Sequence, residues 1–93
     1  MAVSTCIEAP ELDKMDYGRP TKRSLTISGH ETSLSLEPAF WRLLEQAAGE
    51  EGCALVQLVA RIDEERFESR PTPNLTSAVR QWLLHRVQHG LRE

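Results

Sequence analysis

The hydrophobic pattern of one uninterrupted run, TSLSLEPAFWRLLEQAAGEEG (residues 32–52), changes its period at Pro38. Before the proline, Leu34 and Leu36 alternate with serines, and this period of two is typical of a half-buried strand. From Phe40 onward the apolar residues recur at helical spacing. Proline is favoured at the first helical position because its missing N–H has no partner there in any case. The run therefore predicts a short strand that leads directly into a helix, so that both elements face one small core.

A second strand is predicted immediately upstream, where residues 23–28 (RSLTIS) alternate in the same way. The apolar positions change from odd to even numbers across Gly29-His30, so a turn or bulge must lie there to keep them on one face. Glycine followed by another residue suits a two-residue type II′ hairpin turn. The predicted pairs are Ile27 with Thr32 and Leu25 with Leu34.

Three helices are predicted from apolar stripes and from start and stop signals. The first begins at Pro38 and ends at Gly52, because glycine suits the left-handed stop of a helix. The second covers residues 55–67, after which two prolines break the chain. Asn74 can cap a third helix over residues 75–89. The stripes are Phe40, Leu43, Leu44, Ala47 and Ala48; then Leu55, Leu58, Val59, Ile62 and Arg66; then Leu75, Val79, Trp82, Leu83 and Val87.

Charge divides the chain into two parts. Residues 1–18 hold one lysine and four acidic residues, which accounts for the formal net charge of −3 of the 93-residue chain. Residues 19–93 contain as many basic as acidic residues. We therefore expect a flexible acidic tail (1–18) followed by a single neutral domain (19–93). Nucleic-acid-binding domains are usually more basic than this.

The sequence also predicts where the protein acts. Its first residues lack the basic and apolar segments of a signal peptide, and no apolar run approaches the length of a membrane span. Cys6 and Cys53 lie far apart without metal-ligand spacing, as expected of free thiols in a reducing compartment. We therefore expect a cytoplasmic protein that has no membrane partner.

The order strand, helix, helix is the plan of the ribbon-helix-helix fold, and three motifs make the resemblance closer. They are RS-x-T-I-x-G-H at the first strand, S-L-E-P-x-F-W at the start of the first helix, and N-L-[ST]-S-A at the start of the third. Over residues 20–88 the chain resembles the bacterial ribbon-helix-helix domain family, whose fold is that of Arc and MetJ. The resemblance implies a mainly α protein with a short β-ribbon, folded as an intertwined dimer, here with an added C-terminal helix. It also implies a DNA-binding protein that reads the major groove with its ribbon.

The strand over residues 32–37 is expected to find its partner in a second subunit, because its own chain offers few neighbours. Antiparallel pairing of the two copies of this strand would give the subunits one shared core. The predicted dimer core consists of Leu34, Leu36, Phe40, Leu44, Leu58 and Ile62.

The side of this ribbon that faces away from the core is the predicted DNA-reading surface. Ser33 and Ser35 lie on it, and a serine hydroxyl can donate to or accept from base edges. Glu31 could accept a hydrogen bond from a cytosine amino group. The family usually has a basic residue at this position after Gly-His, and a carboxylate is repelled by phosphates. The same serines would equally suit the solvated side of any amphipathic strand.

Two further groups are predicted to contact phosphates. Lys22 and Arg23 lie where the ribbon would approach the DNA backbone, and the alternative is a solvated cluster of charge. The start of the second helix, at Ala54, Leu55 and Val56, offers backbone N–H groups at the positive end of the helix dipole. The family usually has a serine or threonine cap where this chain has Ala54, which carries no acceptor.

No motif indicates an enzyme, a cofactor or a metal site. His85 and His89 are four residues apart on one helix, but a third and a fourth ligand are missing.

The leading hypothesis is a dimeric DNA-binding regulator of transcription. The alternative is a protein-interaction module, antitoxin-like or an adaptor, which keeps the ribbon-helix-helix dimer without strong DNA binding. Such a module would engage a protein partner through the C-terminal helix.

Overall fold

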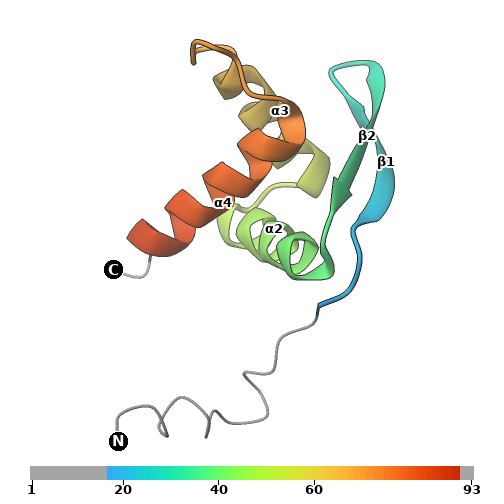
Figure 1. Cartoon of the computed structure of the whole chain (residues 1–93), viewed down its shortest axis with the longest axis vertical. Coiled ribbons are helices and arrows are strands. Elements are labelled where there is room, and N and C mark those ends of the chain that lie inside the picture. Colours follow the sequence, from blue (N-terminus) through green and yellow to red (C-terminus); the bar gives the residue numbers. More distant parts are fainter. Residues whose placement is uncertain (1–16, 91–93) are drawn as a thin grey trace, which may run out of the picture.

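A computed structural model describes residues 17–90, which form a two-stranded hairpin followed by three helices (Figure 1). The elements are β1 (Thr21–Ile27), β2 (His30–Leu36), α2 (Pro38–Glu51), α3 (Leu55–Arg66) and α4 (Leu75–Gly90). Residues 1–16 of the expected acidic tail lie outside the described residues. The predicted fold class, mainly helical with a short β-ribbon and an added C-terminal helix, is confirmed.

The turn between the two strands lies one residue earlier than predicted. Its central positions are Ser28 and Gly29, both with positive φ (52° and 81°). Two positive φ values define a type I′ turn, so the predicted type II′ turn at Gly29-His30 is wrong. The type I′ geometry matches the right-handed twist of the flanking strands, and it leaves His30 as the first residue of β2.

The register of the ribbon changes with the turn, but its two faces do not. Leu25 pairs with Thr32 rather than with Leu34. Ile27 pairs with His30 rather than with Thr32. Both predicted pairs are therefore displaced by two residues along β2, and side chains alternate between the faces with a period of two. The apolar residues of both strands consequently still share one face, which packs on the helices.

Local signals set the helix ends as predicted. Helix α2 begins at Pro38, and Gly52 ends it in the left-handed conformation (φ 72°). Helix α4 begins after Asn74, whose Oδ1 accepts a hydrogen bond from the N–H of Ser77 (2.8 Å). These short-range interactions explain why the bounds of the helices agree closely with the sequence pattern.

A hydrophobic core forms within one chain. The side chains that are at most 2% exposed are Leu34, Leu36, Trp41, Leu44, Ala47, Leu58, Val59, Ile62, Val79 and Leu83. Five of the six residues predicted for a dimer core are thus buried without a second subunit, and Phe40 is partly buried. All seven residues of β2 pair with β1, and among the described residues no other strand pairs with β2.

Helix α4 contributes to the core of its own chain. Val79 and Leu83 are buried, and Leu75 and Trp82 pack against the same cluster while remaining partly exposed. Val87, the last residue of the predicted stripe, is 37% exposed. The predicted apolar stripe of the third helix therefore packs on the core, except in its final turn.

Candidate nucleic-acid interface

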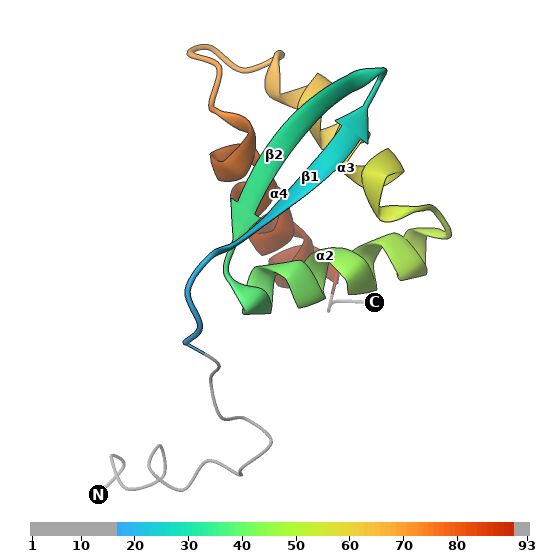
Figure 2. The same cartoon turned by 90° about the vertical axis from the view of Figure 1, so that its right-hand side faces the viewer.

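The ribbon has one face against the helices and one face turned away from them. In Figure 2 the hairpin lies in front of the helices, so its free face is presented to the viewer. We call this free face the outer face; it carries Lys22, Ser24 and Thr26 from β1, and Glu31, Ser33 and Ser35 from β2. The cross-strand pairs on it are Lys22 with Ser35, Ser24 with Ser33, and Thr26 with Glu31. Four hydroxyl groups therefore share this surface with one ammonium group and one carboxylate.

The two serines predicted to read bases lie on the outer face. Ser33 is exposed and Ser35 is partly buried. The sequence reasoning missed Ser24 and Thr26, which lie beside them on β1. The alternation within RSLTIS could have predicted that Ser24 and Thr26 lie on this face, because the polar positions of β1 must share a face once the hairpin forms.

The charged groups of the outer face lie at its two ends. Glu31 is exposed and pairs with Thr26, one pair away from the turn, while Lys22 pairs with Ser35 near the other end of the ribbon. The outer face thus has a negative end at the turn, a neutral hydroxyl-rich centre and a positive end. A surface of this kind can offer hydrogen bonds to base edges but attracts phosphates only weakly.

Arg23 does not lie beside Lys22 on the outer face. It pairs with Leu34, and its guanidinium lies 3.0 Å from the Glu45 carboxylate and 4.1 Å from the centre of the Trp41 ring. Adjacent residues of a strand point to opposite faces, which separates the two predicted phosphate contacts. The guanidinium of Arg23 is therefore engaged by α2 at the edge of the core.

The start of α3 offers the third predicted contact. Ala54 provides no side-chain cap, and its own N–H donates to Oε1 of Gln57 (2.9 Å). The N–H groups of Leu55 and Val56 belong to the first turn, which has no intrahelical acceptors. In Figure 2 this end of α3 lies beside the β1 side of the ribbon. Backbone N–H groups at a helix start of this kind can bind an anion.

Most arginines of the described chain are paired with carboxylates. The ion pairs are Arg23–Glu45, Arg61–Glu51, Arg66–Asp63, Arg80–Glu37, Arg86–Glu50 and Arg86–Glu51. Hydrogen bonds from Arg80 lower the pKa of Glu37, and hydrogen bonds from Arg86 lower the pKa of Glu50 and Glu51. These glutamates therefore stay ionised and offset much of the positive charge that DNA would otherwise meet.

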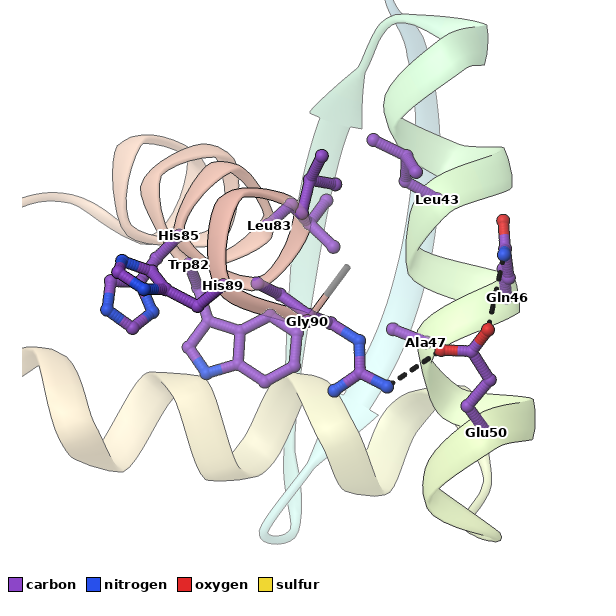
Figure 3. Close-up of a pocket in the computed structure, with 11 residues that line it drawn as sticks. Leu43, Gln46, Ala47, Glu50, Trp82, Leu83, His85, His89 and Gly90 are labelled. Carbon is purple, nitrogen blue, oxygen red and sulfur yellow. Dashed lines mark hydrogen bonds and ion pairs between the residues drawn. The ribbon is translucent and has the colours of Figure 1, made fainter. Parts of the chain in front are cut away.

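A groove of about 590 Å³ lies between α2 and α4, away from the ribbon. His85 and His89 lie together on its α4 side, with ring centres 4.2 Å apart, and Glu50 lies across from them on α2 (Figure 3). The Arg86–Glu50 ion pair (2.8 Å) joins the two helices. Among residues 17–90 no three His, Cys, Asp or Glu side chains gather in the arrangement that a metal ion would need.

The fold is thus a two-stranded ribbon packed on three helices, with a polar face turned away from them. A family model described as a ribbon-helix-helix domain matches residues 20–87, so the chain belongs to the ribbon-helix-helix family. Proteins with this domain are in general DNA-binding regulators rather than enzymes. No curated protein and no solved structure matches the chain. None of the helices within the described residues has the length and apolar character needed to span a membrane.

Proposed function

We propose that the chain acts as a homodimer that binds double-stranded DNA through the outer face and regulates transcription in the bacterial cytoplasm. The observation that carries this proposal is the hydroxyl-rich outer face, which lies clear of the helices in a chain of the ribbon-helix-helix family. A β-ribbon fits the major groove, and serine and threonine hydroxyls can both donate to and accept from base edges.

The free edge of β2 supports a dimer. In a hairpin with a two-residue turn, the pair next to the turn is hydrogen-bonded, so every second residue of β2 directs its N–H and C=O away from β1. By this alternation, those residues are Glu31, Ser33 and Ser35. The described part of the chain has no third strand to satisfy these groups, and unpaired strand edges favour association.

Charge favours one register for the pairing of two β2 strands. If Ser33 faces Ser33 of the second copy, Glu31 lies opposite Ser35, and a carboxylate meets a hydroxyl. If the axis passes through Leu34 instead, Glu31 lies opposite Glu37, and the Arg80 that pairs with Glu37 offsets only part of the repulsion between the two carboxylates. The dimer should therefore be centred on Ser33. Phe40 near the end of β2 is partly buried and has surface left for a second copy.

Electrostatics predict moderate affinity with a shallow dependence on salt. On the outer faces of a dimer, the cations are two Lys22 ammonium groups, and two α3 N-termini can each hold one phosphate. Each neutralised phosphate contributes about 0.9 to the logarithmic salt slope, so four phosphates give a slope of roughly −4. A strongly basic DNA-binding domain would show a much steeper slope.

The direct test replaces both Ser33 and Ser35 by alanine. Fluorescence anisotropy is measured with the best duplex from a selection of genomic fragments and with a scrambled duplex. We expect the double variant to lose preference for the selected site while it keeps its affinity for the scrambled one. Ser69→Ala, on an exposed residue between α3 and α4, is the matched control and should keep the preference. An unchanged preference in the double variant would show that these serines do not read bases.

A second candidate function is a protein-interaction module built on the same dimer. It is favoured by Glu31 on the outer face and by the arginines that are paired with carboxylates. Replacing Glu31 by arginine separates the two candidates. If DNA is the ligand, the variant should bind every duplex more tightly, because repulsion is removed and a phosphate or guanine contact is added. If the parent binds no duplex at about 50 mM salt, where attraction to DNA is strong, the interaction module is the better account.

A further inference from the structure

Strand β1 widens the surface that a dimer would present to DNA, and the inference that follows rests on the proposed function. Neighbouring strands lie about 4.8 Å apart. Pairing of two β2 strands would place a β1 strand on each outer side, so the two β1 strands would be about 14 Å apart. The major groove is about 12 Å wide, which admits a two-stranded ribbon. The β1 strands must then either leave the sheet or lie over the backbones that border the groove.

The contacts of β1 hold it in the sheet. Leu25 and Ile27 are 9% and 5% exposed, and both pack in the hydrophobic core. The indole N–H of Trp41 donates to the backbone oxygen of Thr21 (2.9 Å), and Arg23 is paired with Glu45. Removing β1 would expose both aliphatic side chains and break these contacts, so β1 stays in place when DNA binds.

The chemistry of the two strands on the outer face also differs. Strand β1 contributes Lys22, Ser24 and Thr26, an ammonium group and two hydroxyls, all exposed. The carboxylate of the outer face, Glu31, belongs to β2. Lysine, serine and threonine are common donors to phosphate oxygens, whereas a carboxylate has no proton to donate. All three outer side chains of β1 can thus donate to the DNA backbone, whereas β2 includes one that cannot, Glu31.

We infer that the two strands have different roles in DNA binding: β1 contacts the sugar-phosphate backbone through Lys22, Ser24 and Thr26, and β2 faces the bases. Ser24 and Thr26 are therefore phosphate contacts, although they lie beside the serines that read bases. Their position one strand further from the dimer axis sets this role.

The test compares Lys22→Gln and the double variant Ser24→Ala with Thr26→Val against the parent full-length chain. Affinity is measured for the selected and the scrambled duplex over a series of salt concentrations. Lys22→Gln should weaken both complexes equally and reduce the salt slope by about 2, because a dimer loses two phosphate contacts. The double variant should weaken both complexes by a similar factor with little change in slope. Arg61→Gln, which removes the same charge from α3, should leave both affinities within about twofold of the parent.

Several outcomes would overturn this assignment of different roles to β1 and β2. It fails if the Ser24 and Thr26 variant loses affinity only for the selected duplex, because those hydroxyls would then read bases. It also fails if neither variant weakens binding while the parent still discriminates between the duplexes, a result that leaves the proposed function standing. If the parent binds no duplex, the proposed function and this inference fall together. Thermal melting of each variant, expected to match the parent, excludes misfolding as the cause of a loss.

Discussion

Leucine 83 offers a direct test of how α4 is docked on the core. Leu83 is 1% exposed, whereas Leu84, the next residue on the same helix, is 56% exposed. Truncating a buried leucine to alanine removes about 2 kcal/mol of burial and leaves a cavity, so Leu83→Ala should lower the free energy of unfolding by about 3 kcal/mol. Leu84→Ala removes the same atoms from water and should cost less than about 0.5 kcal/mol.

Urea denaturation followed by circular dichroism, at one fixed protein concentration, measures both effects. For a domain of this size, 3 kcal/mol corresponds to a melting temperature lower by roughly 12 to 24 °C. The urea dependence of the unfolding free energy should stay the same in both variants, because the same surface is exposed on unfolding. Equal costs for Leu83→Ala and Leu84→Ala, or a greater cost for Leu84→Ala, would refute this docking of α4.

Three further predictions concern stability. The pKa of Glu37 lies below its ordinary value of 4.5 because Arg80 donates hydrogen bonds to it, so the ionised carboxylate stabilises the fold above pH 4.5. This contribution should be lost as the pH falls through the lowered pKa, and unfolding curves between pH 7 and 3 should show a smaller acid loss for Glu37→Gln. Gly52→Ala should lower the free energy of unfolding by about 1 kcal/mol in the same denaturation assay. Its Cβ would meet no atom within 4 Å, but alanine is strained in the left-handed backbone conformation (φ 72°) that ends α2. Truncation after Glu68 removes α4 and should abolish cooperative melting; a truncated chain that melts like the parent would show that α4 serves a partner instead.

The helices could be predicted because their signals are local. Pro38, Gly52 and Asn74 each act on the backbone within a few residues of their own position, and the structure uses all three as expected. The outward position of Ser33 and Ser35 could be predicted for the same reason, since alternation along a strand needs no tertiary information.

Two features of the structure could not be predicted from local sequence signals. Glycine can occupy either central position of a primed hairpin turn, and the structure uses Ser28 with Gly29 (φ 52° and 81°), so the register was displaced. The position of the Arg23 side chain depends on its contacts with Glu45 and Trp41, which lie more than a dozen residues away on α2.

Sedimentation of the full chain with a labelled duplex measures dimerisation and DNA binding in one experiment. At about 50 mM salt, we expect the label to move with two 10.5 kDa chains for each bound site. We also expect the protein alone to sediment as a dimer at micromolar concentration. A folded protein that stays monomeric and leaves the duplex sedimenting as free DNA would contradict both the dimer and its role in binding DNA.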